Sequence, residues 1–375
     1  MRIVDLFSGA GGLTFGFYYK LVNGQFVENE NCNIVFANEW DKAAAEAFRK
    51  NFPAINMINK DIKKLTKEEI NKNISNEEID LIIGGPPCQS YSTIGRRQYD
   101  DKAKMYNQYY RMLSIIKPKM FLFENVKGML SMKNPKGGKV IDDIRKKFDS
   151  VNYHIDFKVL DAADYGVPQH RERVFIIGCR KDLNINWSFD NIEKSSKQIS
   201  IKQAINDLPS VSAGNNVESY KGRRPTNDYQ KLMRSHKGHI TCHFSPIYGD
   251  KIQTVINHVK QGEGKNYINQ LVDEGKIPKE YRLTSGYNNT YGRLVESEPS
   301  TTITNNMSTP SGLRCIHYNE NRALTPREGA RIQSFPDWFE FVGTKKDITT
   351  QIGNAVPPLL AMKIATQIEK VLSEV

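Results

Sequence analysis

Short apolar runs dominate the first half of the chain and alternate with segments of helical spacing. The runs are rich in Ile, Val, Leu and Phe and are bounded by glycine or polar residues, which predicts buried strands. They are RIVDLF (2–7), CNIVFANE (32–39), IDLIIGG (79–85), KMFLFE (119–124), YHIDFKVL (153–160) and RVFIIGC (173–179). The segments around 41–51, 106–117 and 137–149 have helical spacing between them. This alternation is typical of βαβ units and predicts an α/β fold with a mostly parallel sheet.

The pattern changes near residue 186. From 186 to 320 the chain is rich in Asn, Ser, Thr, Gly and Tyr, which predicts long loops with short strands at best, as in GYNNTYGRL and PSTTITNN. Helical spacing returns in TPREGARIQSF and in AVPPLLAMKIATQIEKVL, where two prolines suit the first turn of a helix. We therefore predict one domain from residues 1–185 and 321–375, into which a smaller domain, 186–320, is inserted.

The net charge of the chain indicates what kind of partner it binds. The formal net charge is +11, and lysines and arginines that neutralise phosphates release counterions, so a polyanion such as nucleic acid is favoured. The five cysteines are scattered and include no C-x-x-C pair, which fits a reducing compartment. The opening MRIVDLF lacks the features of a secretory signal, and no apolar run is long enough to span a bilayer. These observations predict a cytoplasmic protein that is not bound to a membrane.

Candidate ligand-binding residues follow successive strands. DLFSGAGG joins the first strand to a helix through Gly9, Gly11 and Gly12, a turn that lets a ligand approach the backbone. The next strand ends in Glu39 and Trp40, an acid for a ribose hydroxyl beside a flat aromatic face. Each signal is weak alone, but together they favour a nucleoside site.

Two further strand ends carry candidate catalytic groups. Cys88 lies in GGPPCQSYS, a Gly/Pro-rich turn in which a thiol is reachable by a ligand, although most lone cysteines are buried and inert. Glu124 occupies a comparable position in FLFENVKG. The pairing of a nucleophile with a carboxyl group suits covalent catalysis.

These motifs carry a family resemblance. DLFSGAGG, NEWD, GGPPCQSYS, ENVKG, QHRERVFIIG, LTPREGARIQSFP and QIGNAVPP resemble, in order, the motif set of the DNA (cytosine-5) methyltransferases of bacterial restriction-modification systems. The motifs span nearly all of the chain outside 186–320, and PCQ, ENV and QxRxR in that order are very specific. The resemblance implies a Rossmann-like methyltransferase fold with a smaller, irregular target-recognition domain. It also implies methyl transfer from S-adenosyl-L-methionine to carbon 5 of a cytosine.

The resemblance assigns roles to individual residues. Cys88 would be the nucleophile, Glu124 would bind the cytosine edge, and Arg173, together with Arg171, would complete the catalytic set. The implied cofactor pocket consists of Phe7, Ser8, Gly9, Ala10, Gly12, Glu39, Trp40, Asp61, Ile62, Pro87, Asn354 and Val356. The product would be S-adenosyl-L-homocysteine, and water or an unidentified group would remove the carbon 5 proton. A target base is unreachable in a stacked duplex, so the enzyme must extrude it.

Candidate DNA contacts lie in two regions. The loop after Cys88 offers hydroxyl, amide and basic groups, namely Gln89, Ser90, Ser92, Arg96 and Arg97. Many relatives have arginine after the Asp-Asp pair where this chain has Lys102, which keeps the charge but loses bidentate geometry. In the inserted region, a basic segment and the YGRL and PSTTIT segments supply Arg223, Arg224, Arg293, Thr302 and Thr304. The base sequence that is read does not follow from these residues.

Several alternatives stay open at this point. A tRNA cytosine-5 methyltransferase belongs to a branch of the same family, but the long insertion and the absence of that branch's CFT tripeptide favour DNA. A catalytically dead DNA-binding protein would not need Cys88, Glu124 and Arg173 together. A nicotinamide-dependent oxidoreductase explains only the glycine turn. One short segment contains four side chains that could be mistaken for metal ligands, namely His236, His239, Cys242 and His243. No second cysteine pair supports a metal site, so we expect no metal.

The expected partner is double-stranded DNA, bound by a monomer. A bacterial modification enzyme of this type would protect host DNA from a partner restriction endonuclease, although an orphan methyltransferase would have the same sequence features.

Overall fold

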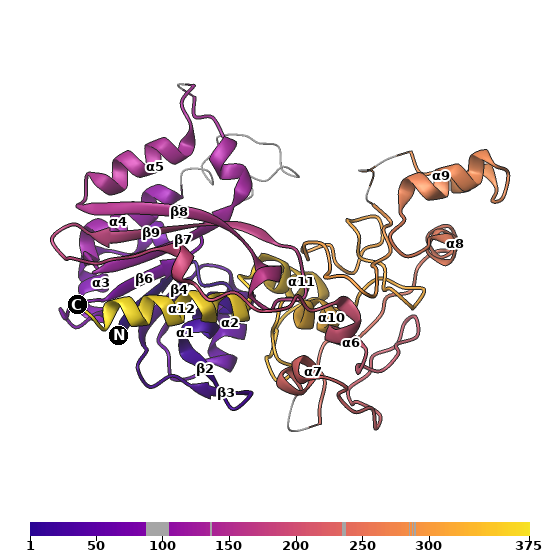
Figure 1. The fold of residues 1–375 in the computed structure, drawn as a ribbon, viewed down its shortest axis with the longest axis horizontal. Coiled ribbons are helices and arrows are strands. Elements are labelled where there is room, and N and C mark those ends of the chain that lie inside the picture. Colours follow the sequence, from indigo (N-terminus) through magenta and orange to yellow (C-terminus); the bar gives the residue numbers. More distant parts are fainter. Residues whose placement is uncertain (88–104, 136, 235–237, 285, 287, 289) are drawn as a thin grey trace.

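A seven-stranded sheet forms the centre of the larger lobe of the molecule (Figure 1). A computed structural model describes residues 1–87, 105–135, 137–234, 238–284, 286, 288 and 290–375. The strand order is β5-β4-β1-β6-β7-β9-β8. The strands are β1 (Arg2–Leu6), β4 (Asn33–Glu39), β5 (Met57–Asn59), β6 (Leu81–Gly84), β7 (Met120–Val126), β8 (Tyr153–Asp161) and β9 (Glu172–Arg180).

The sheet is mostly parallel, as the sequence predicts. Strands β5, β4, β1, β6 and β7 pair in parallel, whereas β9 is antiparallel to both β7 and β8. The order of the parallel strands reverses between β1 and β6, and ligands of open α/β sheets bind at the carboxyl ends of the strands at such a point. The antiparallel β9 places the start of one strand beside the end of β7, a feature that the sequence pattern did not indicate.

Helices cover both faces of the sheet because alternate residues of the buried strands point to opposite sides. Ile3 and Ile83 belong to a core shared with α1 and α12, whereas Val4 and Ile82 belong to a second core beneath α4 and α5. The helices of this lobe are α1 (Gly12–Tyr18), α2 (Lys42–Asn51), α3 (Lys67–Asn73), α4 (Tyr106–Ile116), α5 (Val140–Asp149) and α12 (Pro358–Leu372). These are the helices predicted after the glycine turn, at 41–51, 106–117 and 137–149, and in the C-terminal stretch, with α3 in addition.

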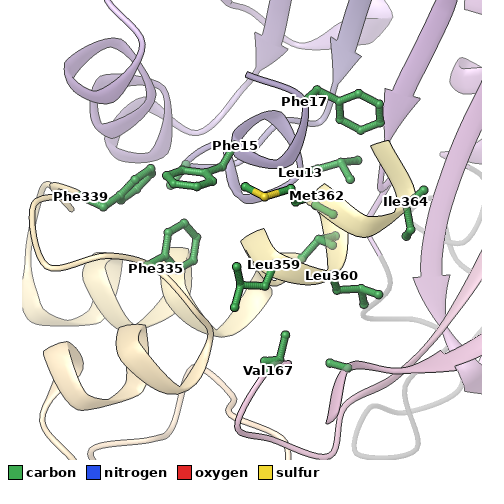
Figure 2. Packing of buried hydrophobic residues seen from close by; sticks show 14 of the residues in the cluster. Leu13, Phe15, Phe17, Val167, Phe335, Phe339, Leu359, Leu360, Met362 and Ile364 are labelled. Atoms are coloured by element: carbon green, nitrogen blue, oxygen red, sulfur yellow. The ribbon is translucent and has the colours of Figure 1, made fainter. Parts of the chain in front are cut away.

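The last helix closes the larger lobe against the first one. Figure 2 shows Leu13 from α1 beside Met362 from α12 and Phe15 from α1 beside Phe339, and all four side chains belong to one buried core. A side chain at Gly16 would lie 2.4 Å from the Ala361 carbonyl carbon, so the two backbones approach more closely than any larger residue permits. The predicted apolar stripe of α12 is therefore buried on the sheet domain.

The region 186–320 differs from its prediction. The described residues there form four α-helices, α6 (Ile201–Ile205), α7 (Asp228–Met233), α8 (Asp250–His258) and α9 (Lys265–Asp273), together with two short 3₁₀ helices and isolated bridges, and they form no strand. The expected short strands are thus wrong, because segments such as 299–306 pair with other loops rather than with neighbouring strands. Helices α8 and α9 pack on each other around Val255, Ile256, Ile268 and Leu271 in a small core of their own.

Two helices lie between the lobes in Figure 1, α10 (Pro326–Ile332) and α11 (Lys345–Asn354). The core that contains α1 and α12 continues through α10 into α6 and α7, where Ile205 and Met233 are buried. The boundaries 1–185, 186–320 and 321–375 stay a prediction. A second unpredicted element is the hairpin of β2 (Tyr19–Val22) and β3 (Gln25–Glu28), which directly follows α1.

Candidate active site

A cavity of about 320 Å³ lies at the carboxyl ends of the parallel strands. The structure brings ten of the twelve predicted cofactor residues to its lining. They are Phe7, Ser8, Gly9, Ala10, Gly12, Glu39, Trp40, Pro87, Asn354 and Val356. Glu124 lines the same cavity, so the predicted cofactor residues and the predicted base-binding acid share one space.

The other two predicted cofactor residues lie elsewhere. Asp61 accepts a hydrogen bond from the Lys63 backbone N–H and caps a short 3₁₀ helix, and Ile62 is buried in the second core. Neither lines the cavity. Their assignment to the cofactor stays a prediction.

The glycine turn after β1 leaves open space beside the cavity. Phe7 and Gly9 have φ angles of +57° and +56°, and an added side-chain carbon at Gly9 would meet no atom within 4 Å. Gly12, in contrast, packs against the Val356 carbonyl oxygen, which an added carbon would approach to 2.4 Å. The turn therefore presents its backbone to a ligand on one side and rests on residues 355–356 on the other.

Glu39 is held in place by the backbone around it. Its carboxylate accepts hydrogen bonds from the N–H groups of Gly9 at 2.9 Å, Trp40 at 2.8 Å and Asp41 at 2.8 Å. Burial raises the pKa of Glu39, and these three donors oppose that shift. The Trp40 side chain beside it is 72% exposed, so its aromatic face is free to stack on a ligand.

Asp5 is a cavity residue that sequence reasoning missed. It is fully buried in β1, and Thr14 donates a hydrogen bond to its Oδ2. Its Oδ1 has no hydrogen-bond partner within the described part of the chain. Burial raises the pKa of Asp5 to about 8, the Thr14 hydrogen bond lowers it, and the charge of Glu39 raises it. The available signal was an acid inside the apolar run RIVDLF.

We predict that Asp5 makes the unfolding free energy fall as pH rises from about 4 to 8. The unfolded chain loses this proton near the ordinary value of 3.8, whereas the folded chain keeps it to about 8. The folded state therefore binds more protons across this window, and raising the pH costs stability. Urea unfolding between these pH values should show a flatter pH dependence for Asp5→Asn than for the unsubstituted chain. An unchanged slope would show that Asp5 titrates normally.

Glu124 and Arg173 form a buried acid–base pair. They lie on the antiparallel strands β7 and β9, where Val126 pairs with Arg173, and Arg173 Nε lies 3.2 Å from Glu124 Oε1. Burial raises the pKa of the Glu124 carboxyl, while the charges of Arg173 and Arg171 lower it. The net direction is upward, so the site favours a proton on this carboxyl next to a fixed positive charge.

The turn after β6 is fixed against Glu124. A side chain at Gly85 would lie 2.8 Å from Glu124 Oε2, and Asn125 Nδ2 donates a 3.2 Å hydrogen bond to the Pro86 carbonyl oxygen. These contacts hold the residues that precede Cys88 at the cavity. Cys88 itself, Gln89, Ser90, Ser92, Arg96, Arg97 and Lys102 lie outside the described residues.

The four other cysteines are poor nucleophiles. Burial raises the pKa of Cys32, Cys179 and Cys315 to about 12 and also raises the pKa of Cys242. Since the thiolate is the reactive form, these thiols stay inert near neutral pH.

Arg171 has a different environment from the one its predicted catalytic role suggests. It is 2% exposed, and its guanidinium donates hydrogen bonds to the backbone carbonyl oxygens of Ile303, Gly353 and Ala355, each at 3.0 Å. These partners could not be predicted from the sequence, because they lie more than 130 residues away along the chain.

Arg293 requires a correction. We predicted that it contacts DNA, but it is 6% exposed and donates hydrogen bonds to the carbonyl oxygens of Ile256, Val259, His317 and Glu320. Its guanidinium joins the small core of α8 and α9 to the loop at 317–321. We therefore remove Arg293 from the DNA-contact set.

The remaining predicted DNA contacts in 186–320 are at or near the surface. Arg223 and Arg224 are exposed, and one Arg223 nitrogen donates to the carbonyl oxygen of Leu208. Thr302 and Thr304 are half-buried, and Thr302 Oγ1 donates to the His170 carbonyl oxygen at 2.8 Å. These four assignments stay predictions.

No group of three or more metal-ligating side chains occurs among the described residues. His243 instead forms hydrogen bonds with Thr325 Oγ1 and the Pro209 carbonyl oxygen. In the same part of the chain, no helix is long and apolar enough to cross a membrane.

Comparison with known proteins decides the family. The family model described as C-5 cytosine-specific DNA methylase matches residues 1–370. The chain belongs to this family. The methylase is 36% identical to the type II methyltransferase M.FnuDI of Fusobacterium nucleatum over 100% of its own length and 96% of that protein. It is 34% identical to M.DdeI of Desulfomicrobium norvegicum over 98% of its own length and 88% of that protein.

The fold of the methylase is also shared with solved structures. A putative DNA modification methyltransferase from an E. coli prophage superimposes with a TM-score of 0.76 at 27% identity, covering 100% of this chain and 99% of that one. The Entamoeba histolytica methyltransferase EhMeth gives a TM-score of 0.62 at 18% identity, over 99% and 98% of the two chains, which shows a common fold. The predicted Rossmann-like methyltransferase fold is thus confirmed.

The methylase is a DNA (cytosine-5) methyltransferase, and S-adenosyl-L-methionine is its methyl donor. The cavity residues fit this molecule. The open side of the glycine turn can accommodate the methionine portion of this molecule. The exposed Trp40 ring can stack on its adenine, and the Glu39 carboxylate can accept hydrogen bonds from its ribose hydroxyls. Asp5 Oδ1, which has no hydrogen-bond partner among the described residues, is a further group that can bond a polar atom of the ligand.

Proposed function

We propose that this methyltransferase acts on a specific sequence of duplex DNA, extrudes one cytosine from the stack, and adds the Cys88 thiolate to carbon 6 of its ring. The observation that carries the proposal is the buried Glu124–Arg173 pair in the same cavity as the glycine turn. A protonated carboxyl group beside a guanidinium is suited to hold the edge of a cytosine. Pro87, directly before Cys88, lines this cavity as well.

The proposed chemistry begins with addition of the Cys88 thiolate to carbon 6. This step forms a sulfur–carbon bond and moves an electron pair of the ring toward carbon 5 and ring nitrogen 3. Glu124 stabilises the negative charge that develops on the ring by donating its proton to nitrogen 3. Arg173 places its positive charge near the oxygen of the base. The raised pKa of the Glu124 carboxyl suits it to hold the proton that this step requires.

The second half of the reaction restores the aromatic ring. When bound, S-adenosyl-L-methionine supplies an electrophilic methyl group, which carbon 5 takes up. Removal of the carbon 5 proton by a base then re-forms the double bond between carbons 5 and 6, and the Cys88 sulfur leaves carbon 6 as a thiolate. Nitrogen 3 returns its proton to Glu124, which restores the carboxyl group for the next turnover. Glu124 keeps the base in place through both halves because its carboxyl group is paired with Arg173 and packs closely against Gly85.

The reacting atoms of cytosine are inaccessible within a stacked duplex, so the enzyme must extrude the target base before the thiolate can attack. The net charge of +11 supports binding to the DNA backbone. The relatives M.FnuDI and M.DdeI are type II methyltransferases. By analogy, we propose that this enzyme works as a monomer in the bacterial cytoplasm and modifies DNA that a partner restriction endonuclease would otherwise cut.

Duplex DNA with 5-fluorocytosine at the target position tests the covalent step. Fluorine cannot leave carbon 5 as a proton does, so we expect the reaction to stop with Cys88 bonded to the base. In the presence of S-adenosyl-L-methionine, a protein–DNA adduct should survive denaturing electrophoresis and should be lost in Cys88→Ala. If the unsubstituted enzyme methylates ordinary cytosine but leaves no adduct with 5-fluorocytosine, covalent addition is excluded.

The substrate is tested separately. Bisulfite sequencing of DNA from cells that express this chain should reveal methylated cytosines within one short sequence. The purified enzyme should transfer methyl groups to duplex DNA that contains this sequence and not to tRNA. Transfer to tRNA alone would overturn the proposed substrate.

A further inference from the structure

The side chains of residues 169–173 point alternately into the protein and toward the surface. Gln169, Arg171 and Arg173 share one side of this extended segment, since side chains alternate along a strand. Gln169 and Arg171 are 0% and 2% exposed, whereas His170 and Glu172 are exposed. The inward side chains therefore form a row that leads from the protein interior to the Glu124–Arg173 pair.

Arg171 joins two segments that come from distant parts of the chain. Its Nη1 donates to the Ile303 carbonyl oxygen, in residues 300–305, here called the return segment because it leads back from the inserted region. Its Nη2 donates to the carbonyl oxygens of Gly353 and Ala355, in residues 353–356, here called the cofactor wall because Asn354, Ala355 and Val356 line the cavity. One guanidinium thus fixes the separation of the two segments.

The return segment and the cofactor wall also touch directly. An added side-chain carbon at Gly353 would lie 2.3 Å from the Asn305 backbone nitrogen and 2.4 Å from the Thr304 carbonyl carbon. Only glycine permits this approach. A shift of the cofactor wall must therefore be transmitted to the return segment, and the reverse holds as well.

Gln169 makes a second, parallel connection. Its Oε1 accepts from the Ile303 N–H at 2.9 Å, and its Nε2 donates to Gln333 Oε1 at 2.6 Å. Gln333 Nε2 in turn donates to the Ile352 carbonyl oxygen at 2.8 Å, one residue before the cofactor wall. Both glutamine side chains are buried, so these hydrogen bonds are shielded from water.

The return segment is attached to the same strand on its other side. His170 N–H donates to the Ser300 carbonyl oxygen at 2.8 Å, and Ser300 N–H donates to the Pro168 carbonyl oxygen at 2.9 Å. Because β9 begins at Glu172 and carries Arg173 to Glu124, any displacement of the return segment changes the position of the base-holding pair.

We propose that Arg171 is a positioning residue that couples binding of the cofactor to binding of DNA. It holds the cofactor wall, the return segment and the base-holding strand in one arrangement, so that a ligand at either site favours the arrangement needed at the other. The inference rests on the proposed function, because it takes Glu124 and Arg173 as the groups that hold the target base. Coupling between two sites is reciprocal, so it can be measured from either ligand.

The experiment measures affinity for S-adenosyl-L-homocysteine by calorimetry, with and without duplex DNA that contains the sequence identified by bisulfite sequencing. The ratio of the two dissociation constants reports coupling and requires no turnover. For the unsubstituted enzyme we expect tighter cofactor binding with DNA, by roughly 5- to 150-fold. In Arg171→Met, which keeps side-chain length but has no donors, the ratio should fall to within about twofold of unity, and Arg171→Lys should recover part of it.

Arg327→Met is the matched control. Arg327 is equally buried and donates to the backbone carbonyl oxygens of Thr241, Pro336 and Phe339, none of which belongs to the cofactor wall or the return segment. Both Met variants should lower the thermal unfolding temperature, but only Arg171→Met should remove the coupling. If Arg171→Met does not fold, the ratio measured for Arg171→Lys decides, and it should lie below that of the unsubstituted enzyme.

Three results would overturn the proposal: a ratio of one in the unsubstituted enzyme, an unchanged ratio in the Arg171 variants, or equal loss of coupling in Arg327→Met. These results are distinguishable from failure of the proposed function. Covalent trapping by 5-fluorocytosine tests Cys88 and the target base through a protein–DNA adduct, which is a different readout from the ratio of dissociation constants.

Discussion

Replacing Cys88 by alanine is expected to abolish methylation, with a loss of roughly 10⁴-fold or more in kcat. Carbon 5 of cytosine is too weak a nucleophile to take up a methyl group unless a thiolate adds to carbon 6, and none of the described cysteines can substitute. Burial keeps Cys32, Cys179 and Cys315 protonated. Transfer of tritiated methyl groups to duplex DNA measures the loss.

The same variant should bind S-adenosyl-L-homocysteine with nearly unchanged affinity. The glycine turn, Glu39 and Asn354, which line the cavity, are untouched by the substitution. Cys242→Ala is the control, because it removes a half-buried thiol outside the cavity and should retain full activity. Methylation by Cys88→Ala above the level of a reaction without enzyme would refute the assignment of the nucleophile.

Replacing Glu124 by glutamine is expected to lower kcat by roughly 10²- to 10⁴-fold. The amide retains hydrogen-bonding groups for the edge of the base, but it cannot transfer a proton to ring nitrogen 3. The fold should persist, because the substitution removes a buried carboxyl group whose pKa burial raises. Single-turnover methylation at saturating cofactor separates this loss from weaker binding.

The pH dependence provides an independent test of Glu124. The protonated carboxyl is the active form, so kcat should fall as the pH rises through the raised pKa of Glu124, and this decrease should be absent in Glu124→Gln. Glu172→Gln is the control, since this neighbouring carboxylate is exposed and paired with Lys127. Equal losses in the two variants would indicate a general effect of charge rather than catalysis by Glu124.

The sheet domain was largely predictable because its strands are buried on both faces. Runs such as IDLIIGG then appear as continuous apolar stretches, and their alternation with helices indicates parallel pairing. The reversed direction of β9 was not predictable, since a buried antiparallel strand has the same composition. The hairpin β2–β3 was missed because YKLV and QFVE are short and half-exposed.

The inserted region was less predictable. Helix α8 has apolar residues at Ile252, Val255 and Ile256, and Val259 directly follows it. This is helical spacing, but the surrounding Asn, Gly and Ser residues favoured loops. Arg293 shows a different difficulty. An arginine in a basic protein suggests a DNA contact, and only the three-dimensional structure shows that four carbonyl oxygens surround it.

The candidate site was predictable where a motif fixes both residue type and position, as for Glu39 and Glu124. Asp5 was not found, because an acid in a strand usually marks a strand end rather than a cavity lining. The partners of Arg171 were not found either, since hydrogen bonds to backbone oxygens leave no trace in the identity of the residues that accept them.

The packing of α12 on α1 has a consequence for the order in which the protein becomes active during synthesis. The glycine turn is synthesised long before Val356 and Ala361, yet Gly12 rests on Val356 and Gly16 rests on Ala361. A nascent chain therefore carries the motif for its methyl donor without the other half of the pocket. The methyl-donor pocket is therefore complete only after Val356 and Ala361 have been synthesised and have packed on α1.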